Sequence, residues 1–174
     1  MSLVLETIPN QGGKTETVII RRTCIADVRE ILTLINRFVQ RNMMLPRGPM
    51  YLYENVPNFI VAEAIDGGTE HGSIIACGSL NILWEDIAEI RSMAIDPEYQ
   101  GLGLGTKIVR YLVEDARHFG IEKLFTFTVA EDFFTNIGFK RKKDEELPQK
   151  VWGECSFCPK YFDCDEVGLL MELH

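Results

Sequence analysis

The chain has 174 residues, of which 46% are hydrophobic, and its formal net charge is −8. This length suits one domain with a full hydrophobic core, and the negative charge argues against nucleic acid and anionic membranes as default partners because both would repel the protein. The apolar runs stop well short of the roughly 20 residues that span a bilayer, and the N-terminus lacks the pattern of a secretion signal, so we expect a cytoplasmic protein.

The N-terminal part is expected to form a tail, a strand and a helix. Residues 1–16 are polar without a sustained period and predict a flexible tail, so the domain proper spans residues 17–174. Residues 17–22 predict a strand, and Thr23 can cap the helix that follows. This helix has one apolar stripe at helical spacing: Val28, Ile31, Leu32, Ile35 and Val39.

The middle of the chain predicts a loop followed by three strands. Two prolines and a glycine break any helix over residues 42–51, and a short helical stretch follows at 51–55. Three runs with strand character then predict an antiparallel meander: 58–65, 72–83 and 87–95.

Helices and strands are expected to alternate in the C-terminal part. An apolar helix face ends at Phe119, Gly120 stands where a C-terminal cap belongs, and residues 122–128 form a buried strand, which together predict a right-handed parallel crossover. The remaining expected elements are a short helix over 130–137, an edge strand from Phe139, a polar insertion over 142–165 and a last strand over 166–173.

Between these two parts lies a loop with alternating glycines. Gly101, Gly103 and Gly105 allow backbone N–H groups to converge on an anion, and the following helix adds the positive end of its dipole. The spacing differs from the G-x-G-x-x-G of dinucleotide sites, and Gly105-Thr106-Lys107 lacks the Gly-Lys-Ser/Thr order of a P-loop. A pyrophosphate cradle is the functional interpretation, and a turn that only packs a strand on its helix is the structural alternative.

The loop and its surroundings resemble the GNAT acyltransferases. The pattern Gln100-x-x-Gly103-x-Gly105 follows the segment AIDP at 94–97, and the segment NIGF lies at 136–139. The resemblance covers residues 17–139 and implies a single-domain α/β (α+β) GNAT fold, in which helices flank a mixed central sheet with splayed strands. It also implies an acyl-CoA-dependent N-acetyltransferase with acetyl-CoA as the acyl donor, and its scheme requires no metal.

The resemblance assigns the acetyl-CoA contacts to one strand end and the loop. Main-chain groups of Met93, Ala94 and Ile95 would hold the pantetheine arm, and a bulge in this strand would free the N–H of Met93 or its neighbour to polarise the thioester carbonyl. The loop residues assigned to the pyrophosphate are Gln100, Gly101, Leu102, Gly103, Leu104, Gly105 and Thr106.

Proton transfer needs separate groups. Glu89 is the candidate general base because an ammonium substrate must lose a proton, and the period of two places it on one face with Arg91 and Met93. The alternative without a catalytic role is that Glu89 is a charged residue at a solvated strand edge. Ser92 is the weaker candidate for a proton relay. Many GNAT enzymes protonate the thiolate with a Tyr at the position of Phe134, which cannot donate, and the possible substitutes are Tyr51, Tyr53 and Tyr99.

Three segments resemble a narrower family, the short stand-alone N-acetylglutamate synthases of arginine biosynthesis. They are residues 44–56, 80–101 and 147–173. Glutamate, which carries two carboxylates, is therefore the expected acceptor. Cationic side chains suited to holding carboxylates are Arg47, Arg91 and Lys150, each of which could instead be an exposed surface cation.

Other interpretations stay open. The acceptor could be another amino acid, a polyamine or a protein N-terminus, and the chain could be a non-catalytic acyl-CoA-binding or regulatory module. Cys155, Cys158 and Cys164 form a C-x2-C-x5-C cluster that predicts a thiol-containing loop rather than a four-ligand metal site. Many GNAT proteins dimerise, so a homodimer is also possible.

Overall fold

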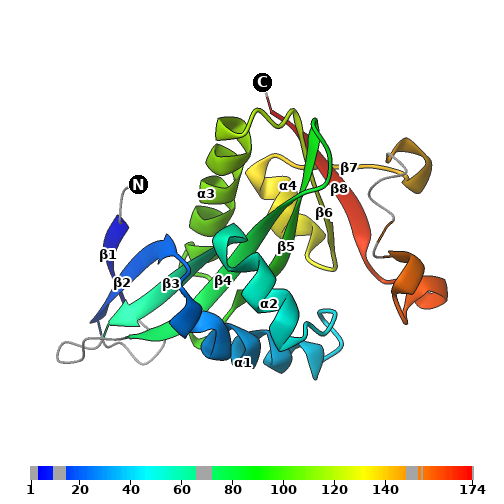
Figure 1. Ribbon diagram of the computed structural model, residues 1–174. Helices are drawn as coiled ribbons and strands as arrows, with labels where there is room; N and C mark the ends of the chain where they lie inside the picture. Colours follow the sequence, from blue (N-terminus) through cyan, green and yellow to red (C-terminus); the bar gives the residue numbers. More distant parts are fainter. Residues whose placement is uncertain (1–3, 10–14, 66–71, 148–152, 154, 174) are drawn as a thin grey trace. The chain divides into compact units, whose positions relative to one another are not determined.

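The protein is described by a computed structural model (Figure 1), which covers residues 4–9, 15–65, 72–147, 153 and 155–173. Two compact units divide the chain: the first comprises Met1–Ser79 and Ser92–Leu112, and the second Leu80–Arg91 and Val113–His174. None of the helices in the described part of the chain has the length and hydropathy needed to span a bilayer.

The described strands form one mixed sheet in the order β1-β2-β3-β4-β5-β6-β8-β7. Strand β5 pairs with β6 in parallel, as the predicted crossover requires, whereas β1/β2, β2/β3, β3/β4, β6/β8 and β7/β8 are antiparallel. The strands are β1 (Val4–Pro9), β2 (Thr15–Arg22), β3 (Phe59–Ile65), β4 (Ser73–Ile82), β5 (Ile87–Ile95), β6 (Lys123–Thr128), β7 (Lys140–Arg141) and β8 (Val167–Glu172).

The α-helices in the described part of the chain are α1 (Val28–Val39), α2 (Pro49–Asn55), α3 (Leu104–His118) and α4 (Glu131–Ile137). Short 3₁₀ turns among the described residues are η1 (Ile25–Asp27), η2 (Val56–Asn58), η3 (Pro97–Tyr99), η4 (Asp144–Glu146), η6 (Cys155–Phe157) and η7 (Tyr161–Asp163). The predicted helix ends at glycine are confirmed, because Gly120 and Gly138 adopt left-handed φ values of 76° and 118° after α3 and α4.

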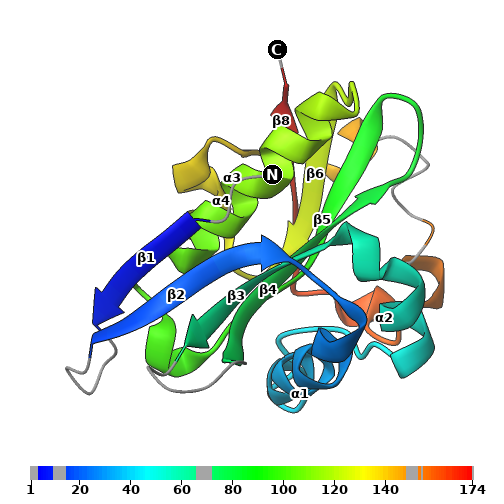
Figure 2. The same ribbon diagram turned by 60° about the vertical axis from the view of Figure 1, so that its left-hand side comes forward.

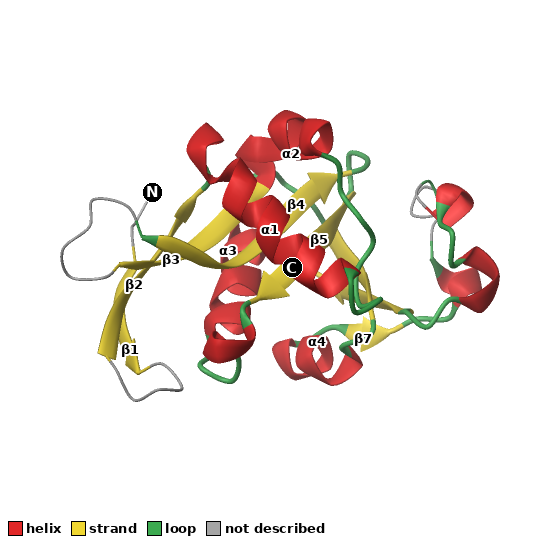
Figure 3. Ribbon diagram, turned by 90° about the horizontal axis from the view of Figure 1, so that it is seen from below, coloured by secondary structure: helices red, strands yellow, loops and turns green. Residues whose placement is uncertain are grey.

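Helices cover both faces of the sheet in the first unit. Helices α1 and α2 lie together over β3 and β4 (Figures 2 and 3) and share an apolar core that includes Ile35, Leu52, Phe59 and Cys77. The next residue, Gly78, faces α3 instead, since a Cβ placed there would lie 3.0 Å from the Cγ2 atom of Ile108. Cys77 and Gly78 face opposite sides of the sheet because side chains alternate along a strand.

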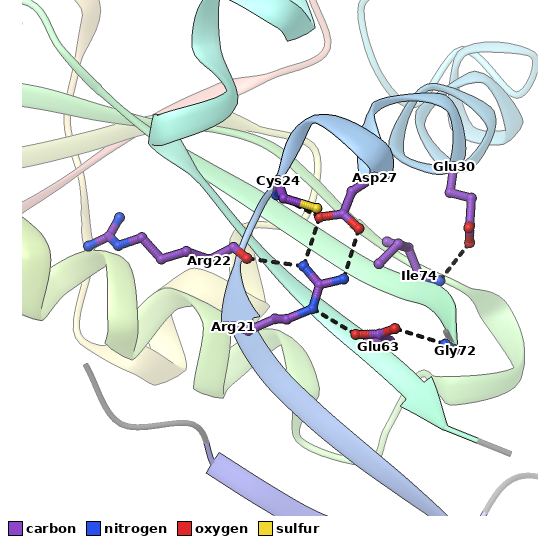
Figure 4. A network of polar contacts seen from close by, with 8 residues as sticks. All are labelled: Arg21, Arg22, Cys24, Asp27, Glu30, Glu63, Gly72 and Ile74. Carbon is purple, nitrogen blue, oxygen red and sulfur yellow. Dashed lines mark hydrogen bonds and ion pairs between the residues drawn. The ribbon is translucent and has the colours of Figure 1, made fainter. Parts of the chain in front are cut away.

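A polar network ties β2 to β3 and to the start of α1 (Figure 4). The guanidinium of Arg21 donates to both carboxylate oxygens of Asp27, at 2.7 and 2.8 Å, and to Glu63 at 2.6 Å. Burial alone would raise the pKa of each carboxyl, but the bonds from Arg21 and from the backbone N–H groups of Cys24 and Gly72 outweigh it and lower both pKa values. The network therefore holds two mostly buried carboxylates in the ionised form.

Two expectations about the N-terminal part are wrong. Residues 4–9, predicted as part of a flexible tail, form β1 and pair with β2 along its length. Thr23 does not cap a helix, because its Oγ1 atom is buried without a hydrogen-bond partner among the described residues. The carboxylate of Asp27 accepts instead from the Cys24 N–H at 2.7 Å, so the turn is closed by a residue that Arg21 holds in place.

The second unit has its own small core. Ile87 of β5, Phe125 of β6 and Leu170 of β8 pack together with Leu147. The insertion expected over 142–165 contains the turns η4, η6 and η7, the last two of which lie beside the start of β8 (Figure 1, orange and red).

Candidate active site

The glycine loop connects β5 to α3 within the first unit. Gly101 and Gly103 have φ values of 76° and 80°, the left-handed region that favours glycine. A Cβ at either position would have no neighbour within 4 Å. These positions therefore require glycine for the backbone conformation, and the space beside them is open.

Side chains hold the entrance of this loop in place. The Asp96 N–H donates to the Ile75 carbonyl at 2.7 Å, and the Asp96 carboxylate pairs with Arg37 at 2.5 Å while it accepts from the Glu98 N–H. The side-chain amide of Gln100 donates to the Ile95 carbonyl at 3.0 Å. Gln100 thus connects the end of β5 to the beginning of the loop, which is a structural reason for a glutamine at this position.

The loop ends at the first turn of α3. The Lys107 N–H bonds to the Gly103 carbonyl at 3.1 Å, so the helical hydrogen bonds begin there and the N–H groups of Leu104, Gly105 and Thr106 precede them. Three N–H groups at the positive end of a 15-residue helix can bind phosphate oxygens.

Strand β5 contains one residue with an irregular backbone conformation, shortly before this loop. Ser92 has a φ of 53°, which a non-glycine residue rarely adopts. Its hydroxyl is buried and has no hydrogen-bond partner among the described residues. The buried thiol of Cys77 on β4 donates to the Ser92 carbonyl at 3.4 Å. This conformation lies one residue before Met93, and the bulge that the resemblance implies for this strand stays a prediction.

Glu89 and Arg91 lie on the part of β5 that belongs to the second unit. Glu89 is only 7% exposed, which excludes the solvated strand edge as its environment. Its carboxylate accepts from the Arg91 Nε at 2.5 Å, and both side chains are nearly buried. The period of two correctly predicted that these side chains share a face, and the structure adds that they are paired with one another.

Comparisons with known proteins decide the family. Residues 26–142 match the model of the Acetyltransferase (GNAT) family. The chain belongs to this family. The GNAT chain is 33% identical to an amino-acid acetyltransferase of Mycobacterium tuberculosis over 82% of its own length and 79% of the relative's. It is 29% identical to an uncharacterized N-acetyltransferase of Chlorobaculum tepidum, over 88% and 96% of the two chains.

Solved structures agree with this assignment. The GNAT chain matches Rv2747 of M. tuberculosis, solved with CoA and NLQ, at a TM-score of 0.72 and 27% identity, over 89% of this chain and 99% of the other. It also matches N-acetylglutamate synthase of Neisseria gonorrhoeae, solved with coenzyme A and N-acetyl-glutamate, at a TM-score of 0.77 and 25% identity. That match covers 90% of this chain and 35% of the Neisseria protein, so the chain spans about a third of the longer enzyme.

The residues predicted to bind the acceptor lie in different places in this GNAT protein. The Arg47 guanidinium lies 4.5 Å from the centre of the Tyr51 ring. Arg47 precedes α2 and Tyr51 belongs to it, both in the first unit. Arg91 is in the second unit. Lys150 lies outside the described residues.

The tyrosines differ in their availability as proton donors. The hydroxyl of Tyr99 donates to the Glu16 carboxylate, and burial, together with this carboxylate, raises its pKa. Tyr51 has a buried hydroxyl without a partner among the described residues, and Tyr53 is exposed. Phe134 is buried and packs edge-on against Phe139, so the ring at the usual tyrosine position is part of the core.

The cysteine cluster and the predicted base both belong to the second unit. Burial raises the pKa of the Cys155 thiol to about 11, with smaller contributions from Cys164 and from the charge of Glu89. The Lys160 N–H donates to the Cys158 sulfur at 3.4 Å. Within the described residues, no three His, Cys, Asp or Glu side chains are grouped to hold a metal ion. The negative charge of Glu89 thus acts on the Cys155 thiol, an interaction that no spacing in the sequence indicates.

Proposed function

We propose that this GNAT protein transfers the acetyl group of acetyl-CoA to the α-amine of an amino acid, with L-glutamate as the expected acceptor. The observation that carries this proposal is similarity over most of the chain to proteins named amino-acid acetyltransferase, at 33% identity in one case. A second support is the fold shared with an N-acetylglutamate synthase that was solved with coenzyme A and N-acetyl-glutamate.

The donor would bind along β5 and the glycine loop. In this scheme the N–H groups at the start of α3 bind the pyrophosphate, while main-chain groups of Met93, Ala94 and Ile95 hold the pantetheine arm. The open space beside Gly101 and Gly103 supports this placement, because the backbone there is approachable. Positioning of the amine against the thioester would supply several kcal/mol of the rate acceleration.

The ion pair of Glu89 and Arg91 suggests how the base becomes available. A guanidinium paired with a carboxylate stabilises its charged form, which limits its capacity to accept a proton. A substrate carboxylate is an equivalent partner for Arg91. We infer that binding of the amino acid would draw Arg91 from Glu89, and that Glu89 then accepts the ammonium proton. Arg47 and Lys150 are the further proposed carboxylate contacts.

The proposed chemistry balances without a tyrosine acid. Glu89 takes one proton from the substrate ammonium through an intermediate carrier, and the amine attacks the thioester carbonyl to form the new C–N bond. The N–H of Met93 would stabilise the resulting oxyanion. Cleavage of the C–S bond then releases coenzyme A as a thiolate, which a thiol reference pKa of about 8.5 allows, and the amide nitrogen loses its second proton to solvent.

Coenzyme A release tests the proposal. Purified protein is mixed with acetyl-CoA and single acceptors, and free thiol is followed with a chromogenic reagent, against blanks that correct for the five cysteines of the chain. The acceptors are glutamate, glutamine, aspartate and spermidine. Glutamate-dependent release together with mass-spectrometric N-acetylglutamate supports the proposal. Release with spermidine alone would assign a polyamine acceptor, and tight acetyl-CoA binding without release would assign a binding module.

A further inference from the structure

Ser92 stores strain in the middle of a strand. Among the described residues, only Asn42 and Ser92 combine a positive φ with a side chain, and Asn42 is in the turn after α1. Asparagine tolerates that conformation, whereas serine rarely adopts it. Such a conformation is energetically unfavourable and persists only where its surroundings enforce it. The contacts around Ser92 should therefore show what holds it.

Cys77 on β4 is the residue that engages this backbone. Its side chain is completely buried, and its thiol donates to the Ser92 carbonyl at 3.4 Å. Burial raises the pKa of this thiol to about 12, although the Ala94 N–H, which donates to the same sulfur, acts in the opposite direction. The thiol therefore keeps its proton at working pH. The neutral Cys77 side chain thus forms hydrogen bonds with both the Ser92 carbonyl and the Ala94 N–H, on either side of Met93.

Because the peptide bond is planar, the contact with the Ser92 carbonyl also determines the direction of the Met93 N–H. The Ser92 carbonyl and the Met93 N–H belong to one trans peptide unit, so they point in opposite directions. With the carbonyl directed at Cys77, the Met93 N–H is directed away from Cys77. The pairing of β5 with β6 covers Ile87 to Glu89 and does not reach Met93. The bond to Cys77 is therefore one contact that orients this N–H, in addition to the pairing of β5 with β4.

Gly78 fixes the Met93 side chain in addition. A Cβ at Gly78 would lie 2.3 Å from the Met93 Sδ, so the thioether occupies the space that the glycine leaves. Two consecutive residues of β4 thus define the position of Met93, Cys77 through the backbone and Gly78 through the side chain.

We propose that Cys77 is a positioning residue for acetyl transfer, whose thiol holds the Ser92–Met93 peptide so that the Met93 N–H faces the thioester carbonyl. This inference rests on the proposed function, in which that N–H stabilises the oxyanion. Cys77 itself does not touch the substrate. Its role differs from that of a nucleophile, because the buried thiol stays protonated and no bond to sulfur forms.

Three variants separate positioning from packing. Cys77→Ser keeps a donor, and Cys77→Val has a similar volume but no donor. Val61→Ala removes methyl groups from the same apolar core, at the β3 position paired with Cys77, and serves as the packing control. For Cys77→Val we expect kcat to fall by about 10²-fold, comparable with the loss of one oxyanion donor, with the KM for acetyl-CoA nearly unchanged. Cys77→Ser should retain most of kcat, and Val61→Ala should lose thermal stability but not kcat.

A second readout needs no turnover. The infrared carbonyl band of bound acetyl-CoA, labelled with ¹³C at the acetyl carbonyl, should lie at lower wavenumber than in solution when the Met93 N–H polarises it. The shift should persist in Cys77→Ser and vanish in Cys77→Val. An equal shift in both variants would overturn the inference, as would equal kcat values. Absence of turnover in the wild type with every acceptor would refute the proposed function instead, and the infrared comparison would still decide the role of Cys77.

Discussion

Replacement of Gly101 by alanine gives a quantitative test of the glycine loop. Gly101 and Gly120 have the same φ of 76°, and a Cβ at either position has no neighbour within 4 Å. An L-residue in this conformation costs about 1–2 kcal/mol. Because contacts are equal and the strain is equal, Gly101→Ala and Gly120→Ala should lose similar stability, which corresponds to roughly 2–8 °C in Tm for a chain of this size.

The two variants should differ only in acetyl-CoA binding. Gly120 ends α3 away from the loop in the sequence, so its variant should bind acetyl-CoA like the wild type. In Gly101→Ala the loop either keeps its shape under strain or relaxes to a negative φ, and relaxation redirects the N–H groups. If binding must restore the strained form, 1–2 kcal/mol corresponds to a Kd higher by about 5- to 30-fold.

Isothermal titration with acetyl-CoA and thermal unfolding measure the two quantities on the same samples. Gly101→Asn is a rescue variant, since asparagine tolerates the left-handed region better than alanine, and its Kd should lie between those of the wild type and Gly101→Ala. An unchanged Kd in Gly101→Ala, or an equal loss of affinity in Gly120→Ala, would refute the loop as the anion site.

Three further predictions concern charged groups. Glu89→Gln should lower kcat by about 10²- to 10⁴-fold and shift its pH profile upward, and wild-type rates at pH 7 would remove Glu89 as the base. Arg47→Ala and Arg91→Ala should raise the glutamate KM by tenfold or more while acetyl-CoA binding is kept; exposed Arg29→Ala is the control, and KM values equal to its value would contradict both assignments. The two carboxyls paired with Arg21 have lowered pKa values, so they stabilise the fold above their ordinary values of 3.8 and 4.5, and this contribution is lost as pH falls below them. Denaturant titrations from pH 7 to pH 3 should show this loss in the wild type, and Arg21→Met should be less stable at pH 7 by about 3–5 kcal/mol, with a difference that shrinks in acid; a constant difference would contradict the network.

Local signals predicted most of the fold. Gly120 and Gly138 end their helices as expected, and the three central strands were placed to within one residue at each end. Such features depend on backbone freedom and on periods of two or 3.6 residues, which neighbouring residues determine. β1 was missed because its strand structure depends on pairing with β2. The Thr23 cap was wrong because Arg21 on β2, which also binds Glu63, holds Asp27 in the capping position.

In the candidate site, too, some features follow from local sequence and others only from the fold. The loop residues and the shared face of Glu89 and Arg91 follow from a contiguous stretch of sequence. The bond from Cys77 to the Ser92 carbonyl depends on how β4 and β5 face one another, which no spacing in the sequence reports. Nothing distinguishes Cys77 in its apolar strand from an ordinary core residue, so its contact could be found only in the folded chain.

The position of the proposed base along β5 limits how it can act. Glu89 and Met93 are four residues apart in the sequence, and a regular strand of that length measures about 13 Å. A glutamate side chain cannot span this distance to an amine that is held next to the Met93 N–H. A proton passing from the amine to Glu89 therefore needs an intermediate carrier, either ordered water or a hydroxyl. Ser92 lies between these residues in the sequence, and its hydroxyl is buried without a partner among the described residues. A relay through Ser92 requires that its positive φ turn the hydroxyl toward the face of Glu89. The strained backbone of Ser92 would then serve both steps, because the same residue orients the Met93 N–H for the oxyanion and carries a hydroxyl for the proton.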